Sequence, residues 1–275
     1  SWPELRRQVS ALALHLQAQG VGQGDRVAAY LPNIPQTIVA FLAVVSLGAI
    51  WSVCAPDMGT NAVLDRFRQI TPKALIACDG VTYAGRDHPR TSVVEELRAA
   101  LPSVEHLVLL RNLGGQPALA NCADFDAIVS HVAPEQRQFE PRWLPFDHPL
   151  WIVYSSGTTG EPKGIVQPHS MRWAHVKRGS TYDYSPTSVT LLSTPLYSNT
   201  TLVVFFPTLA FGGRVALMRK AFEATARDPD FLADAKKQGV EISVMTGAEV
   251  RDLVAKIYAT PKAIVETGKR IAAGG

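Results

Sequence analysis

The sequence has little cysteine, little net charge and no long apolar run, and each shortage argues against a class of protein. Its three cysteines, Cys54, Cys78 and Cys122, are far apart and odd in number. They suit a reducing compartment and have no zinc-ligand spacing, so we expect them to be small core residues. A net charge of +3 with scattered basic residues gives no support for a nucleic-acid partner. Because no apolar run reaches about 18 residues, we expect no membrane span.

The start of the chain also lacks two features. Ser1 stands where an initiator Met is absent, and no signal-peptide pattern follows it. These absences predict a cytoplasmic location and an excised or incomplete chain.

Residues 154–164 have the sequence Y-S-S-G-T-T-G-E-P-K-G and directly follow the apolar run at 150–153. Glycines let backbone N–H groups approach phosphate oxygens closely, hydroxyls add donors, and lysine adds a compact positive charge. The spacing differs from a Walker loop, because Pro162 stands where that motif has glycine. We therefore predict a loop that binds the phosphates of a nucleoside triphosphate, in preference to a Gly- and Thr-rich hairpin that binds nothing. The predicted binding residues are Ser155, Ser156, Gly157, Thr158, Thr159, Gly160 and Lys163.

Short apolar runs alternate with helical patterns over the first 110 residues. Strands are expected at 26–31, 49–54, 73–78 and 104–110, and helices at 1–19, 36–47, 63–70 and 93–101. Ser1 and Glu4 predict a capping box on the first helix, and Gly20 predicts its end. This alternation predicts an α/β fold with a mostly parallel sheet wrapped by helices, whose ligand sites lie at the carboxyl ends of strands.

The chain is less regular after residue 111. Five prolines between 112 and 149 predict a surface excursion or a link between subdomains. A strand at 164–167 and a helix at 171–178 are expected next, with core segments at 189–193 and 214–218. Residues 201–211 are expected to continue the core, and their apolar run at 201–206 fits either a strand or a buried helix.

Residues 155–164 resemble the signature loop of the adenylate-forming superfamily, which includes acyl-CoA synthetases. The runs at 51–57, 63–67 and 145–151 are similar to acetoacetyl-CoA synthetases, whereas 192–199 is more like fatty acyl-CoA synthetases. The resemblance favours a helix at 201–206 and implies the N-terminal part of the family's large domain. It also implies ligase chemistry: ATP and Mg²⁺ activate a carboxylate as acyl-AMP, and the acyl group passes to coenzyme A. The identity of the substrate acid is left open between acetoacetate and a fatty acid.

Two further residues that follow the loop are candidate site residues. The resemblance implies that Tyr197 lies near the acyl-substrate or pyrophosphate site, and a core aromatic is an equal alternative. His169 fits a surface or capping histidine better than a phosphate contact. No protein nucleophile and no metal ligand is predicted, because catalysis in this family is electrostatic and positional.

Several family motifs that normally follow are absent from the printed sequence. These are the Y-G-x-T-E stretch for adenine and magnesium, an aspartate for ribose, a hinge arginine and a lysine on a mobile C-terminal domain. We expect residues 1–220 to form a partial adenylate-forming domain and residues 221–275 a helix-rich tail of different origin. That tail resembles the C-terminal helices of tricarboxylate-type solute-binding receptors.

The sequence therefore supports an acyl-CoA synthetase-like ligase that is inactive alone. A non-catalytic nucleotide-binding module, or a fragment completed by a partner chain, is the first alternative. A solute-binding protein is the second.

Overall fold

A computed structural model describes residues 1–83, 86–114, 119–155, 162–192 and 194–217. The chain divides into two compact units, one of residues 1–81 with 87–221 and one of residues 82–86 with 222–275. The first unit carries the main sheet and its helices. The predicted tail after residue 220 lies outside the described residues.

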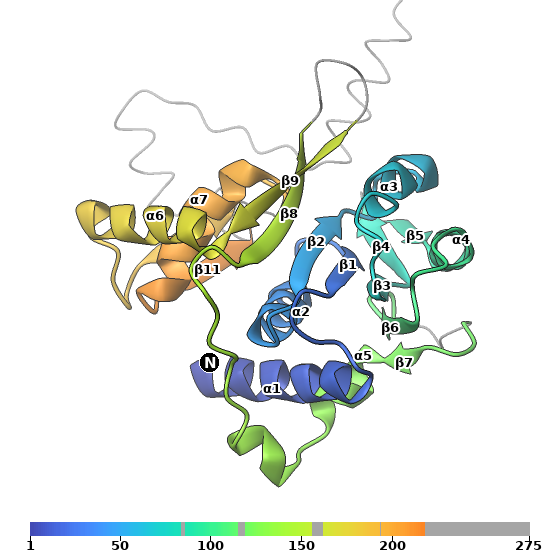
Figure 1. The fold of residues 1–275 in the computed structure, drawn as a ribbon, viewed down its shortest axis with the longest axis horizontal. Helices are drawn as coiled ribbons and strands as arrows, with labels where there is room; N and C mark the ends of the chain where they lie inside the picture. The colour runs from blue at the N-terminus through green and yellow to red at the C-terminus, as the bar shows by residue number, and fades with distance from the viewer. Residues whose placement is uncertain (84–85, 115–118, 156–161, 193, 218–275) are drawn as a thin grey trace, which may run out of the picture. The chain divides into compact units, whose positions relative to one another are not determined.

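A seven-stranded sheet forms the centre of the first unit (Figure 1). Its strand order is β7-β6-β3-β1-β2-β8-β9, and every neighbouring pair is parallel except β8 with β9. This confirms the predicted α/β fold with a mostly parallel sheet. The strands are β1 Arg26–Tyr30, β2 Ile50–Cys54, β3 Ala74–Cys78, β6 His106–Leu110, β7 Ala123–Asp124, β8 Pro149–Ser155 and β9 Lys163–Pro168. Two smaller sheets pair β4 Gly80–Tyr83 with β5 Arg86–Pro89, and β10 Val189–Leu192 with β11 Arg214–Leu217.

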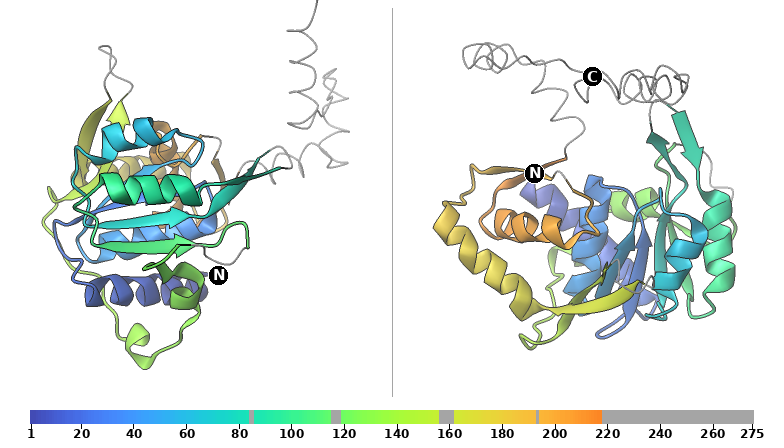
Figure 2. Two further views of the ribbon diagram at one scale, coloured as in Figure 1. Left: turned by 90° about the vertical axis from the view of Figure 1, so that its right-hand side faces the viewer. Right: turned by 90° about the horizontal axis from the view of Figure 1, so that it is seen from above.

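Helices cover both faces of the sheet (Figure 2). On one face, α3 and α4 pack against the strands, and on the other α1, α2, α5 and α7 do so. The helices are α1 Trp2–Ala18, α2 Pro35–Ser46, α3 Thr60–Phe67, α4 Thr91–Ala100, α5 Phe125–Ser130, α6 His169–Gly179 and α7 Asn199–Ala210, with short 3-10 turns at η1 Pro134–Arg137 and η2 Ser180–Tyr182.

The alternation of side chains along each strand explains this two-sided packing. In β2, Trp51 and Val53 contact the α1 and α2 side, whereas Ile50 and Cys54 contact the α3 side. Because successive strand residues point to opposite faces, one short apolar run supplies both cores. Trp51 is fully buried and lies edge-on to Trp151 of β8, with ring centroids 6.2 Å apart.

Most predicted elements are present, with two corrections. The capping box at Ser1 and Glu4 was wrong: Ser1 is the N-cap but makes no side-chain cap bond. Glu4 instead accepts hydrogen bonds from Arg7 Nε at 2.8 Å and Gln8 Nε2 at 2.7 Å, since side-chain donors one turn along, one of them a charged guanidinium, compete with the backbone N–H for its carboxylate. Gly20 does end α1, with φ of +79°.

The second correction concerns residues 112–149. This segment is more than a surface excursion, because it contains β7 and α5. The ring of Phe125 at the start of α5 is fully buried, and Arg7 Nη1 on α1 donates to the Val129 carbonyl at 2.7 Å. Residues 201–206 lie within α7, Asn199–Ala210, so they are helical, as the family resemblance favoured.

Candidate functional site

The predicted phosphate loop connects the two strands of an antiparallel hairpin. Ser155, the last residue of β8, stands opposite Lys163, the first residue of β9, and Tyr154 stands opposite Gly164. Ser155 is half-buried, and Lys163 is exposed. The predicted residues Ser156, Gly157, Thr158, Thr159 and Gly160 lie outside the described residues. The structure therefore describes both ends of the predicted loop.

The start of this loop lies at the carboxyl edge of the main sheet. Because β8 runs parallel to β2, which runs parallel to β1, Ser155 ends its strand at the same edge as Cys54 and Tyr30. Ligands of open α/β sheets bind at this edge. The predicted position of the loop thus agrees with the place where such sheets bind ligands.

The end of α3 anchors the β8 side of the hairpin. The Tyr154 hydroxyl donates to the Arg66 carbonyl at 2.7 Å, and the Arg66 guanidinium lies 5.7 Å from the centre of the Tyr154 ring. Burial raises the pKa of Tyr154, so its hydroxyl stays protonated and can donate. One strand away, Ser52 Oγ donates to the Ile152 carbonyl at 3.0 Å. These contacts fix the strand that leads into the loop.

Gln69 anchors the other side. Its Nε2 donates to the Pro162 carbonyl at 2.8 Å, and its Oε1 accepts from the Gly164 N–H at 3.2 Å. Sequence reasoning missed this residue, because nothing in the local pattern distinguishes a glutamine at the end of an expected helix from a solvated one.

Tyr197 lies in a turn that is tied to the carboxyl end of β1. Asn33 Nδ2 donates to the Thr194 carbonyl at 3.3 Å, and its Oδ1 accepts from the Leu196 N–H at 2.9 Å. Burial and the nearby Asp57 carboxylate raise the pKa of Tyr197, and Asp57 follows β2 at the same edge. The structure therefore brings Tyr197 to the carboxyl edge. A role in acyl or pyrophosphate binding stays a prediction.

His169 lies at the opposite end of β9 from the loop. Six residues separate it from Lys163, which corresponds to about 20 Å along an extended strand. His169 begins α6 and is partly buried, with its ring centroid 6.2 Å from that of His148. Burial, followed by His148, lowers its pKa. This position agrees with the structural interpretation of His169 rather than with a phosphate contact.

Burial also determines the reactivity of Cys54 and Cys78. Cys54 and Cys78 are almost fully buried, and burial raises the pKa of each thiol to about 12. A thiol with so high a pKa is a poor nucleophile and a poor metal ligand. Among the described residues, no group of three His, Cys, Asp or Glu side chains is arranged to hold a metal ion.

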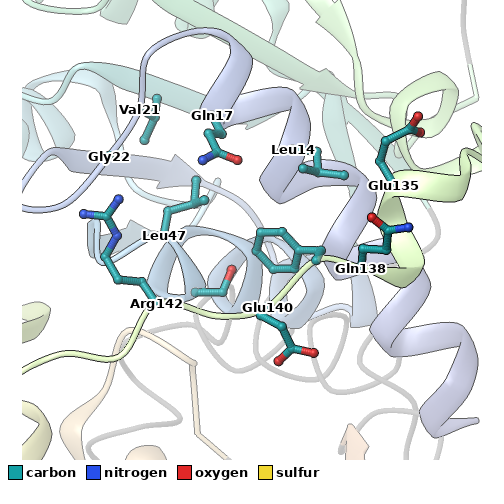
Figure 3. A pocket seen from close by; sticks show the side chains of 11 residues that line it. Leu14, Gln17, Val21, Gly22, Leu47, Glu135, Gln138, Glu140 and Arg142 are labelled. Atoms are coloured by element: carbon teal, nitrogen blue, oxygen red, sulfur yellow. The ribbon is translucent and has the colours of Figure 1, made fainter.

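A cavity of about 390 Å³ lies elsewhere, between α1, the end of α2 and the residues around η1 (Figure 3). Leu14, Val21, Leu47 and Phe139 supply apolar walls, and Glu135, Glu140 and Arg142 supply charges. Neither Ser155 nor Lys163, the two predicted phosphate-binding residues that the structure describes, lines it. We assign no role to this cavity.

A match to a protein-family model identifies the family of this chain. The model of the AMP-binding enzyme family matches residues 1–271. The chain belongs to the AMP-binding enzyme family. Within the described part of this family member, no helix is both long and apolar enough to cross a membrane.

Several curated proteins are similar to this AMP-binding chain. Acetoacetyl-coenzyme A synthetase from Rhizobium meliloti (strain 1021) is 47% identical over 174 residues, which cover 60% of this chain and 26% of that protein. The acetoacetyl-CoA synthetase of Mus musculus is 40% identical over 174 residues, with the same coverage. Malonamoyl-CoA synthetase vrtB from Penicillium aethiopicum is 38% identical over 174 residues and matches 60% of this chain and 24% of its own length. The AMP-binding chain thus spans about a quarter of the length of these relatives.

Solved structures agree on the fold. Acetoacetyl-CoA synthetase from Streptomyces lividans superposes with a TM-score of 0.75 at 36% identity, covering 87% of this chain and 39% of that one. A luciferase-like enzyme from Zophobas morio superposes with a TM-score of 0.66 at 20% identity, covering 84% of this chain and 50% of that one, and shows the fold alone.

Proposed function

We propose that this chain is the nucleotide-phosphate-binding front part of an acyl-CoA synthetase of the acetoacetate-CoA ligase type. The observation that carries the proposal is the hairpin of β8 and β9, which presents Ser155 and Lys163 on neighbouring strands at the carboxyl edge of the sheet. An exposed lysine at the end of a glycine- and hydroxyl-rich loop fits a polyphosphate, because an ammonium group and backbone N–H groups are its usual ligands.

The role of each described residue follows from its position. Lys163 would bind the outer phosphates of ATP and balance the negative charge that develops on the departing pyrophosphate. Ser155 would place the start of the predicted loop beside the outer phosphates of ATP. When bound, ATP supplies the α-phosphorus that a carboxylate attacks. Mg²⁺ and coenzyme A belong to the proposal through the family, and no described residue is assigned to either.

The relatives favour a short acid over a long one. Two of them are named for acetoacetyl-CoA and one for malonamoyl-CoA. Both acyl groups are short and carry a second carbonyl near the thioester. We therefore propose acetoacetate, or an acid of that class, as the substrate of the whole enzyme, with fatty acids as the competing class.

Calorimetric titration with ATP and with inorganic tripolyphosphate tests the phosphate site. We expect both to bind, and Lys163→Ala to weaken each by about tenfold or more, since a charge-assisted contact contributes about 1.5–3 kcal/mol. Lys177→Ala, which removes another exposed lysine near the end of α6, is the matched control and should leave binding unchanged. Absence of binding, or equal effects of the two variants, would refute the site.

We further propose that the 275-residue chain alone releases little or no pyrophosphate, because the printed sequence lacks the adenine, ribose and hinge motifs of the family. An assay of pyrophosphate release with ATP and either acetoacetate or fatty acids tests this. Robust turnover with any of these acids would contradict it.

A non-catalytic module completed by a partner chain is the second candidate, and one observation favours it. Large apolar side chains are exposed along β9 and β10: Ile165, Val166, Val189 and Leu191 are 44–58% exposed. Single exposed apolar residues are ordinary, whereas β9 is an edge strand with an exposed apolar residue on each face, Ile165 on one and Val166 on the other, which fits a strand that further polypeptide covers. The proposed occupant is polypeptide equivalent to the part of the relatives that this chain does not match.

Mixing experiments test the second candidate. The unmatched part of the Rhizobium meliloti synthetase, added in increasing amounts, should form a complex with this chain on size-exclusion chromatography and raise pyrophosphate release. The double variant Ile165→Lys, Val166→Lys should abolish both effects, and Val132→Lys, at a 68% exposed position after α5, should not. Association that survives the double variant would argue against this surface. No observation among the described residues favours a solute-binding protein.

A further inference from the structure

Two amide side chains hold the two candidate-site segments in the same way. Gln69 bonds to the carbonyl of Pro162 and the N–H of Gly164, and Asn33 bonds to the carbonyl of Thr194 and the N–H of Leu196. In both cases the amide donates to residue i and accepts from residue i+2. One residue of a parallel neighbouring strand would satisfy the same two backbone groups. Each side chain thus replaces one rung of a β-ladder.

Each amide fixes the backbone of the residue that lies between its two bonded positions. For Gln69 that residue is Lys163, the cation of the predicted phosphate loop. For Asn33 it is Pro195, two residues before Tyr197. Both amides come from residues 33–69, whereas the segments they hold follow 93 to 163 residues later in the sequence. These bonds are therefore tertiary contacts that orient distant segments.

The surroundings of Gly164 show how closely the segment is held. A Cβ at this position would lie 3.3 Å from Ile152 Cγ2, 3.4 Å from Tyr154 Cε1 and 3.6 Å from Gln69 Oε1. Among the described residues, β9 has only β8 as a neighbour in the sheet, so backbone groups at its start have no second described strand to bond. Gln69 supplies partners for two of them. The backbone on both sides of Lys163 is thereby fixed although its side chain is exposed.

We infer that Gln69 is a positioning residue that sets where the Lys163 ammonium group lies relative to a bound polyphosphate. The inference rests on the proposed function, because it takes Lys163 as the phosphate contact. Gln69 itself need not touch the ligand. Two hydrogen bonds hold the backbone on either side of Lys163, and losing them costs that backbone its preorganised position.

A double-mutant cycle tests this inference in the full 275-residue chain, with tripolyphosphate as the probe. Gln69→Met removes both bonds, together with the bond from Gln69 Nε2 to the Asp65 carbonyl of α3, at nearly constant size and should weaken binding by about 5- to 30-fold. In the Lys163→Ala background the same change should have almost no further effect, because the two residues act through one contact. Gln19→Met, an exposed glutamine at the end of α1, is the control and should leave binding unchanged. An equal loss in both backgrounds would overturn the inference.

Amide hydrogen exchange separates failure of the inference from failure of the proposed function. If the unaltered chain binds no tripolyphosphate, the proposed function fails. The Gly164 N–H should still exchange faster in Gln69→Met than in the unaltered chain, while amides in β1 stay unchanged. Unchanged exchange at Gly164 would show that Gln69 holds nothing and would overturn the inference whatever the ligand result.

Discussion

Arg172 is a buried cation without a carboxylate partner among the described residues. It is 2% exposed, donates to Asn199 Oδ1 at 3.0 Å, and lies 5.6 Å from the centre of the Phe206 ring. Burial lowers its pKa to about 10. The free energy of folding therefore includes a desolvation cost that amide and aromatic contacts offset only in part.

This environment predicts opposite effects for two substitutions of Arg172. Arg172→Met removes the buried charge and keeps the volume, and Asn199 Oδ1 keeps its bond from Gln167 Nε2. We expect a change of less than about 1 kcal/mol, or a gain. Arg172→Lys keeps the charge but loses the planar fork, and should destabilise the fold by about 1–3 kcal/mol. Urea denaturation measures both, and a loss of several kcal/mol in Arg172→Met would contradict this account.

Partly buried histidines predict how stability depends on pH. Burial, followed by Arg172 and Arg178, lowers the pKa of His175, and burial also lowers the pKa values of His15 and His169. Because these folded-state values lie below the ordinary 6.5, the unfolded chain binds more protons as the pH falls through this range. The free energy of unfolding should decrease from about pH 7 through 6.5 and level off below the folded-state values.

Denaturation curves at several pH values between about 5 and 7.5 measure this effect. His175→Gln should make the decrease shallower, and the exposed control His131→Gln should not. A stability that rises as the pH falls over this window would show that the sign is wrong.

Single residues also show where sequence reasoning reaches its limit. The cluster of glycines and hydroxyls before Lys163 is a local pattern, so the phosphate loop can be predicted without a structure. Gln69 and Asn33 have no such pattern, because neither an exposed nor a half-buried amide carries a local sign of a partner 93 or 161 residues away.

At the scale of elements, α6 and α7 meet at a glycine. A Cβ on Gly179, the last residue of α6, would lie 2.9 Å from Pro207 Cβ and 3.0 Å from Phe211 Cε2. The proline ring within α7 cannot rotate away. The two helices therefore depend on the missing side chain at this position.

Gly179→Ala should separate these helices and destabilise the fold by about 1–3 kcal/mol, despite the better helix propensity of alanine. Gly22→Ala is the control, since its Cβ would meet nothing within 4 Å, and should change stability by less than about 0.5 kcal/mol. Thermal unfolding of both variants, followed by circular dichroism, distinguishes them. Equal melting temperatures would contradict the close packing.

The elements that could be predicted are those with a strong local signal. Each of β1, β2, β3 and β6 is an apolar run bounded by turn residues, and its helix neighbours have apolar faces. β7 has only two residues, Ala123 and Asp124, and exists because it lies beside β6, so its sequence alone could not reveal it. The strand order likewise depends on long-range pairing, which propensities do not encode.

At the scale of the whole first unit, β1, β2 and β3 are more deeply buried than β9 and β10. The residues of β2 and β3 are all buried, and β1 is buried apart from Arg26. β9 is exposed over its first four residues, and β10 is exposed at Val189 and Leu191. Local unfolding should therefore begin at β9 and β10.

Native-state hydrogen exchange measures this gradient. We expect amides of β1, β2 and β3 to be protected at least about 100-fold more than those of β10 and β11, which corresponds to about 2.7 kcal/mol of opening free energy. Uniform protection across both sheets would show that the first unit opens as a single cooperative block.

The pairing of β8 with β2 has a consequence for synthesis of the chain. Trp51 pairs with Trp151, and 100 residues separate them. At about 5–20 residues per second, β2 emerges from the ribosome roughly 5–20 s before its neighbour exists. During that interval its outer edge has no strand to bond, and nascent β1, β2, β3 and β6 must remain soluble with an open edge. Codon changes that speed or slow translation between residues 54 and 149 should therefore alter the yield of folded protein without altering its stability.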